Sequence, residues 1–159
     1  MIKVLFPASF DPIHNGHIDI INRATKIFDE VVVGVYNLPE KDLLFTVDER
    51  LKLVEECFIG RPKIKIVVYG GLTVDFCREI GAKVILRGLR VFSDFEYEFR
   101  LALSNSELAP EIETLSFITN KEHSFLSSST VREIAMLGGD VSSMVPANVL
   151  EALKLKRNS

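Results

Sequence analysis

The stretch Val31-Val32-Val33-Gly34-Val35-Tyr36 decides the fold class of this 159-residue chain. It is an almost continuous apolar run rich in β-branched residues, which is typical of a strand buried on both faces of a parallel sheet. Other short runs along the chain have a similar character. The sequence therefore predicts five strands, at residues 2–6, 31–36, 64–69, 83–86 and 113–119.

Helical patterns alternate with these strands. Residues 18–27 carry apolar side chains at helical spacing, and the segment Thr46-Val47-Asp48-Glu49 matches a capping box at a helix start. Further helices are expected at residues 73–80, 95–108, 128–137 and 146–155. Strands that alternate with helices through short links predict an α/β fold with a doubly wound, five-stranded parallel sheet and a helical C-terminus.

Length and composition describe an ordinary folded chain. The 159 residues predict one domain spanning residues 1–159, and 47% hydrophobic with 26% charged residues argue against disorder. A net charge of −3 disfavours a protein that coats nucleic acid through bulk charge. Cys57 and Cys77 are too few for a disulfide scaffold and form no CxxC motif. Because the apolar runs are too short for a signal peptide or a membrane span, we expect a soluble cytoplasmic protein.

The residues that follow the first strand are candidates for a binding site, because ligands of such folds bind beyond the carboxyl ends of the strands. Neither GxGxxG nor a P-loop stands there; Ser9 is followed by His14-Asn15-Gly16-His17, which enters a helix. A helix N-terminus attracts anions, and a histidine there can donate to a phosphate. The two histidines could equally be cap residues, and a zinc site is disfavoured because further ligands are not evident.

Three other strand ends carry polar or cationic side chains. Arg87-Gly88-Leu89-Arg90 follows the fourth predicted strand, and the planar fork of arginine matches phosphate oxygens. Ser127-Ser128-Ser129 offers hydroxyl and backbone N–H groups at a helix start, and Lys41 follows the second strand. Each of these could alone be a solvated turn or a cap. Their convergence on one edge of the sheet predicts a site for a polyphosphate or for two phosphorylated ligands.

The combination of these segments resembles the phosphopantetheine adenylyltransferases, a family of nucleotidyltransferases that carry a His/Thr-x-Gly-His motif. The likeness rests on Ser9-Phe10-Asp11-Pro12, Asn15-Gly16-His17, Arg87-Gly88-Leu89-Arg90, Asp94-Phe95-Glu96-Tyr97-Glu98 and Ser127-Ser128-Ser129. It implies a Rossmann-like nucleotidyltransferase fold. It also implies transfer of the adenylyl group of ATP to 4′-phosphopantetheine, which gives dephospho-coenzyme A and pyrophosphate in coenzyme A biosynthesis.

The same resemblance implies cofactors and partners. Mg²⁺ is the expected cofactor, held mainly by phosphates rather than by protein ligands. Coenzyme A is the expected feedback ligand, the expected assembly is a homohexamer in the cytoplasm, and neither nucleic acid nor a membrane is an expected partner.

The resemblance also implies the site residues. His17 would contact the α-phosphate and stabilise the transition state. The phosphopantetheine would be bound by Ser9, Lys41, Thr73 and Arg87. The ATP would be bound by Ser9, Phe10, His17, Gly88, Leu89, Arg90, Glu98, His123, Ser124, Phe125, Leu126, Ser127, Ser128 and Ser129. Three positions depart from the usual family pattern, namely Ala8, His14 and His123.

Attack of one phosphate on another needs no protein nucleophile, because the acceptor oxygen is already ionised. We therefore expect direct in-line displacement, in which the protein positions two anions and stabilises the developing charge. Three alternatives remain open. They are a nucleotidyltransferase acting on nicotinamide mononucleotide or a glycerol phosphate, a silent nucleotide-binding protein that keeps only the fold, and a nucleic-acid-binding module.

Overall fold

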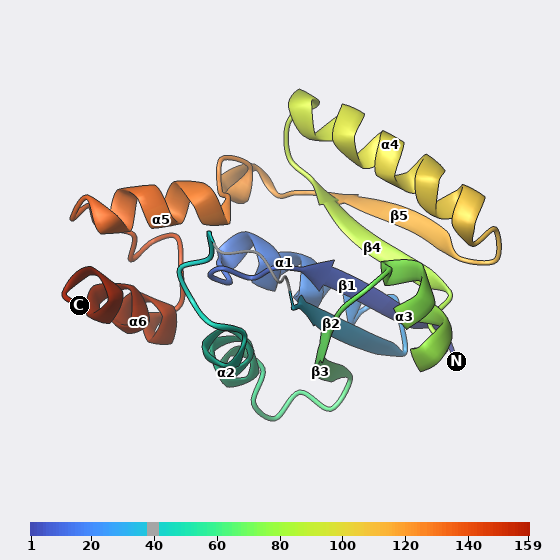
Figure 1. The fold of residues 1–159 in the computed structure, drawn as a ribbon, viewed down its shortest axis with the longest axis horizontal. Helices are drawn as coiled ribbons and strands as arrows, with labels where there is room; N and C mark the ends of the chain where they lie inside the picture. The colour runs from blue at the N-terminus through green and yellow to red at the C-terminus, as the bar shows by residue number, and fades with distance from the viewer. Residues whose placement is uncertain (38–41) are drawn as a thin grey trace.

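The computed structural model describes residues 1–37 and 42–159, apart from the side chains of residues 92 and 93. Strands and helices alternate along nearly the whole chain (Figure 1). The strands are β1 (Lys3–Ala8), β2 (Glu30–Tyr36), β3 (Ile64–Tyr69), β4 (Val84–Leu89) and β5 (Glu113–Ile118). The helices are α1 (Asn15–Ala24), α2 (Val47–Cys57), α3 (Thr73–Ile80), α4 (Phe92–Leu108), the 3₁₀ turn η1 (Lys121–His123), α5 (Ser128–Met136) and α6 (Ala147–Arg157).

The described strands form one parallel sheet in the order β3-β2-β1-β4-β5. The predicted α/β class, the five-stranded parallel sheet and the helical C-terminus are thereby confirmed. The chain first adds strands outward from β1 to β3 and then returns to the other side of β1 with β4. The strand order thus reverses between β1 and β4, and this is where such sheets leave room for a ligand.

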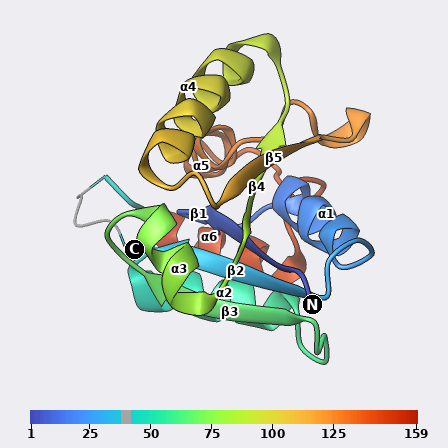
Figure 2. The ribbon, with the colours of Figure 1, turned by 90° about the vertical axis from the view of Figure 1, so that its right-hand side faces the viewer.

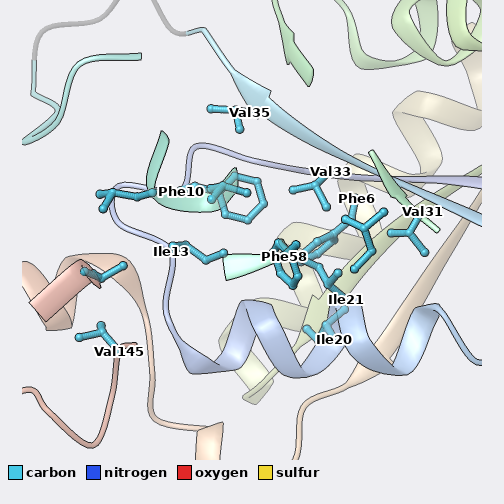
Figure 3. Close-up of a cluster of buried hydrophobic side chains, with 14 of the residues drawn as sticks. Phe6, Phe10, Ile13, Ile20, Ile21, Val31, Val33, Val35, Phe58 and Val145 are labelled. Carbon is cyan, nitrogen blue, oxygen red and sulfur yellow. The ribbon is translucent and has the colours of Figure 1, made fainter. Parts of the chain in front are cut away.

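Helices cover both faces of the sheet, and Figure 2 shows α1 and α3 on opposite sides of β1 and β2. Side chains alternate between the faces along each strand. Phe6, Val31 and Val33 face Ile20 and Ile21 of α1 (Figure 3). On the other face, Leu5, Val32 and Ile85 pack with Val74, Phe76 and Cys77 of α3. None of the described helices is both long and apolar enough to cross a membrane.

Strand β4 runs further than the sequence pattern predicts. Arg87, Gly88 and Leu89 are its last residues rather than the residues that follow it. The pairing with β5 continues through Leu89 and Ile118, and the Thr119 N–H donates to the Leu89 carbonyl at 2.9 Å. The prediction ended at Leu86 because hydrophobicity ended there, whereas the backbone ladder does not depend on apolar side chains.

A buried guanidinium of α2 forms hydrogen bonds at the carboxyl ends of β1 and β2. Arg50 is 1% exposed and donates to the carbonyls of Ser9 (2.6 Å), Tyr36 (2.9 Å) and Phe45 (3.3 Å). The neighbouring carboxylate of Asp11 is fully buried and accepts the backbone N–H groups that precede α2. These bonds hold the loop between β1 and α1 in one conformation.

Helix α6 contacts α2 through an ion pair and a hydrogen bond. Lys156 forms an ion pair with Glu49 at 3.0 Å, and Asn148 donates to the Leu53 carbonyl at 3.2 Å. Glu49 also accepts the Thr46 N–H, so that the predicted capping box of α2 is present. The last helix therefore supports the helix from which Arg50 reaches the loop.

Replacement of Arg50 by methionine should destabilise the protein by about 3 kcal/mol, because buried carbonyls lose their donor and Asp11 loses a nearby positive charge. Urea unfolding followed by circular dichroism measures this change. Arg61→Met, at an exposed position, is the matched control and should shift stability by less than about 0.5 kcal/mol. Equal effects of the two substitutions would contradict the role given to Arg50.

Candidate active site

A cavity opens at the carboxyl edge of the sheet, where the strand order reverses. Its walls come from the end of β1, the first turn of α1, the end of β4, the first two turns of α4 and the segment that joins β5 to α5. The N-termini of α1 and α5 both contribute residues to it. Because helix N-termini carry partial positive charge, the cavity is suited to an anionic ligand.

The two histidines at the start of α1 are at once cap residues and part of the cavity wall. His14 is the N-cap, and its Nδ1 accepts the Gly16 N–H at 3.0 Å; Nδ1 of His17 accepts the His14 N–H at 3.1 Å. The two rings stack with centroids 3.8 Å apart. A Cβ on Gly16 would lie 2.8 Å from the His14 ring, so this position requires glycine.

Both imidazoles are neutral. Burial is the main cause that lowers the pKa of His14 to about 3, with smaller contributions from the charges of Arg90 and His123. Burial, followed by His14, Arg90 and Arg87, likewise holds the pKa of His17 well below its ordinary range. Since Nδ1 of each ring accepts a hydrogen bond, the remaining proton is on Nε2. His17 can thus offer an Nε2–H donor to a ligand without changing its charge.

Two arginines enter the cavity, Arg87 from β4 and Arg90 from the position directly after it, and each is held by a carboxylate of α4. Arg87 donates through Nε and Nη2 to the two oxygens of Glu98, each at 2.9 Å. Arg90 donates in the same way to Asp94, at 2.8 and 3.0 Å. Burial opposes the charge on Arg87, yet its bonds to Glu98 raise its pKa. The guanidinium groups are charged and fixed in direction.

The serine run begins α5 as the sequence predicts. Ser127 is the N-cap, and its hydroxyl accepts the Thr130 N–H at 3.1 Å. The hydroxyl of Ser128 donates to the Pro12 carbonyl at 2.8 Å, which joins α5 to the loop before α1. The Leu126 carbonyl accepts from Nη1 of Arg90 at 2.6 Å. The capping interpretation is therefore correct for Ser127, while Ser127 and Ser128 also line the cavity.

The cavity brings together a large part of the residues predicted for the site. Those that line it are His17, Arg87, Gly88, Arg90, Glu98, His123, Leu126, Ser127 and Ser128. Ser9, Phe10, Thr73, Leu89, Ser124, Phe125 and Ser129 are not among the lining residues. Lys41 lies outside the described residues.

Two of the residues outside the lining have clear positions. Phe10 has a left-handed backbone (φ 52°) that directs its side chain into the core, 1% exposed, with its ring centroid 4.9 Å from that of His17. It supports His17 from behind instead of facing the cavity. Thr73 begins α3, where its hydroxyl pairs with the Tyr69 hydroxyl at 3.0 Å.

The structure adds residues that sequence reasoning did not assign to the site. Asp94 and Tyr97 reach it from α4, Ile20 from α1, and Thr119 from the end of β5. The Thr119 hydroxyl is buried and has no hydrogen-bond partner in the described part of the chain. Asp94 and Tyr97 stand in the segment that carried the resemblance, and this was a signal for them. No local pattern marks Ile20, which reads as an ordinary core position.

The described side chains of the cavity do not form a group of protein metal ligands. Within residues 1–37 and 42–159, no group of three or more His, Cys, Asp or Glu side chains could hold a metal ion. The carboxylates that line the cavity, Asp94 and Glu98, are engaged by arginines. This donor set fits a magnesium ion that arrives with a polyphosphate, because Mg²⁺ commonly takes few protein ligands and several phosphate oxygens.

Comparison with known proteins places the chain in a family. The profile of the cytidylyltransferase-like family matches residues 5–134. The chain is 51% identical to the phosphopantetheine adenylyltransferase of Roseiflexus castenholzii over 97% of this chain and 96% of the relative. It is 50% identical to that of Alkaliphilus metalliredigens over 96% of this chain and 97% of the relative. The chain belongs to the phosphopantetheine adenylyltransferase family.

The fold is shared more widely than this family. A putative nicotinate-nucleotide adenylyltransferase from Vibrio parahaemolyticus superposes with a TM-score of 0.71 at 20% identity, over 100% of this chain and 98% of that one. At such low identity the likeness concerns the fold alone. The phosphopantetheine adenylyltransferase family is therefore identified by sequence, and the Rossmann-like nucleotidyltransferase fold by structure.

Two of the departures from the family pattern have a structural role here. His14 supplies the cap for α1 and the stacking surface for His17. His123 ends η1 and lines the cavity opposite the start of α1, where its Cβ lies 3.7 Å from the position of a Cβ on Gly16. Ala8 ends β1 and also lines the cavity.

Nitrogen-15 NMR of the histidine side chains should show His14 and His17 as neutral Nε2–H tautomers at pH 5.5. A histidine in an unfolded chain is largely protonated at that pH, because its pKa is about 6.5. A protonated His17 signal at pH 5.5 would contradict the assignment.

Folding stability should accordingly fall as the pH drops below about 6.5, since the unfolded chain takes up protons that the folded chain refuses. The slope is about 1.4 kcal/mol per pH unit for each such histidine. His14→Asn should reduce the slope between pH 6 and pH 5 relative to the unsubstituted chain.

Proposed function

We propose that this chain, acting as one nucleotidyltransferase domain over residues 1–159, transfers the adenylyl group of ATP to 4′-phosphopantetheine. The observation that carries this proposal is the meeting of Arg87, Arg90 and His17 with the N-termini of α1 and α5 in one cavity. Two phosphorylated ligands can be held there side by side. Sequence identity near 50% to phosphopantetheine adenylyltransferases supports the choice of acceptor.

The reaction is a direct in-line displacement. An ionised oxygen of the acceptor phosphate attacks the α-phosphorus of ATP, the bond from that phosphorus to the β-bridging oxygen breaks, and pyrophosphate leaves with the electron pair. No proton must be removed from the nucleophile. Catalysis consists of bringing the two anions into line and stabilising the charge that develops at the α-phosphate.

His17 is suited to the second task. Its Nδ1 is engaged by the His14 N–H, so the ring is held in one orientation with Nε2–H available. Because the ring is neutral, it donates a hydrogen bond to the α-phosphate oxygens without the risk of losing its proton to them. We assign to Arg87 the phosphate of the acceptor and to Arg90 the phosphates of ATP.

Magnesium is proposed as the cofactor on the donor set described above. When bound to the ATP phosphates it neutralises part of their charge. The Ser127 hydroxyl is engaged by Thr130, so the start of α5 would reach the same phosphates through its partial positive charge and its first backbone N–H groups. Coenzyme A, which contains the product of the reaction, is proposed to compete for the same cavity.

Pyrophosphate release in the presence of ATP and Mg²⁺ tests the function, with 4′-phosphopantetheine or nicotinamide mononucleotide as the acceptor. Turnover is expected with 4′-phosphopantetheine alone. Turnover with nicotinamide mononucleotide alone would show that the chain is a nucleotidyltransferase with a different acceptor. The absence of pyrophosphate release with either acceptor would refute the proposal.

Two substitutions separate the cap function of His17 from its role in catalysis. His17→Asn places an oxygen near the Nδ1 position and keeps the acceptor for the His14 N–H, but it removes the Nε2 donor. It should lower kcat by about 10²–10³-fold, as the loss of one oxyanion donor does. His17→Gln can return an N–H donor near the Nε2 position and should recover part of the rate. An unchanged kcat in His17→Asn would remove His17 from the mechanism.

We also propose that the chain assembles as a homohexamer, as the family resemblance implies. The outer face of α4 exposes Phe95 (54%), Phe99 (52%) and Leu103 (56%), and this helix lies beside the edge strand β5 (Figure 1). An apolar face of this kind favours association with another copy.

Sedimentation should therefore give a six-copy particle. Phe99→Glu should shift it to smaller species, while Ile59→Glu, at an exposed position after α2, should leave it intact. A purely monomeric protein at micromolar concentration would contradict the assembly.

A further inference from the structure

The two arginines of the cavity are held by one repeated device. Asp94 and Glu98 are four residues apart and therefore share a face of α4. Each carboxylate receives Nε and Nη2 of one arginine, with four distances between 2.8 and 3.0 Å. The atoms used are the same in both pairs, so each guanidinium is gripped along the same side.

A third donor of each arginine is fixed by a backbone carbonyl. Nη1 of Arg87 donates to Pro7 at 3.2 Å, and Nη1 of Arg90 donates to Leu126 at 2.6 Å. A guanidinium has five N–H groups. One N–H on Nη1 and one on Nη2 of each arginine thus have no acceptor in the described part of the chain. Such a pair of donors can bind two oxygens of one phosphate.

Without the carboxylates this arrangement would be costly. Arginine loses much rotamer freedom when it is fixed, and two guanidinium groups at the same cavity repel each other. Burial works against the charge on Asp94, yet the bonds from Arg90 lower the pKa of its carboxyl, so it stays ionised. The α4 carboxylates therefore compensate the repulsion and determine the direction of both forks.

We propose that Asp94 and Glu98 are positioning residues for adenylyl transfer, each acting through the arginine that it holds. Glu98 acts through Arg87 on the phosphate of the acceptor, and Asp94 acts through Arg90 on the phosphates of ATP. This inference rests on the proposed function. It changes the role that sequence reasoning gave to Glu98, from a contact with ATP to the orientation of an acceptor-binding arginine.

Steady-state kinetics with one substrate varied and the other saturating distinguishes the two residues. Glu98→Gln should raise KM for 4′-phosphopantetheine about tenfold or more and change KM for ATP less than about twofold, since a misdirected fork weakens one ligand alone. Asp94→Asn should give the opposite pattern. Glu98→Asp and Asp94→Glu, which keep the charge, should restore part of each loss.

A double substitution tests whether Glu98 acts through Arg87. Lysine at position 87 keeps the charge but has no fork to orient. In the Arg87→Lys background, Glu98→Gln should therefore change KM for the acceptor less than about twofold, in contrast to its effect in the unsubstituted chain. Independent, multiplicative effects of the two substitutions would overturn the proposal.

Glu96→Gln is the matched control, because it removes the same charge from an exposed position of the same helix. Glu96→Gln should leave both KM values unchanged. If it changed KM for one substrate as Asp94→Asn or Glu98→Gln does, a general effect of charge would explain the results and the positioning role would be wrong. If Asp94→Asn and Glu98→Gln raised KM for both substrates equally and lowered Tm in parallel, the ion pairs would only stabilise the fold. An unsubstituted protein that is inactive with 4′-phosphopantetheine would refute the proposed function; activity without the KM split would refute only the positioning role.

Discussion

The buried guanidinium of Arg50 is the constraint on which the rest of the site depends. In a parallel sheet the carbonyls at the carboxyl ends of the strands must find donors. Arg50 supplies them for Ser9, which follows β1, and for Tyr36, the last residue of β2. The carboxylate of Asp11 is fully buried and accepts the backbone N–H groups of Leu44 and Phe45. The loop that carries His14 and His17 is therefore built on a rigid base before any ligand enters.

From this base the site extends to elements far apart in the sequence. Arg132 of α5 donates to the Asp11 carbonyl at 2.7 Å, and Ser128 donates to Pro12 at 2.8 Å. Helix α5 thus docks on the same loop, and Leu126 at its start accepts from Arg90 at the end of β4. Hydrogen bonds thus join the loop after β1 to α5, α5 to the end of β4, and β4 back to β1 through Arg87 and the Pro7 carbonyl. Each of the three elements therefore fixes the positions of the other two.

Much of the fold was accessible from the sequence because it depends on local patterns. The run at 31–36 and the helix Thr73–Ile80, which ends at Gly81 in a left-handed conformation, are where the pattern predicts them. The start of α1 was missed because its capping box is made by two imidazoles, whereas the recognisable pattern pairs Ser or Thr with Glu or Gln. Strand β4 was predicted too short because Arg87 and Gly88, which follow its apolar run, line the cavity and do not belong to the core. The resemblance implied Glu98 as a site residue but not Asp94, because the pairing of an α4 carboxylate with an arginine at the end of β4 has no signature within one segment.

The ion-paired state of the arginines has a consequence for the rates at which substrates arrive. A cavity with bare cations would attract anionic substrates over a long range and lose that advantage as salt screens its field. Here the charges of Arg87 and Arg90 are balanced by Glu98 and Asp94 at contact distance, and both histidines of α1 are neutral. Among the described residues, these two ion pairs therefore contribute little to long-range electrostatic steering of ATP and the acceptor, and their contribution to the association rates depends little on ionic strength.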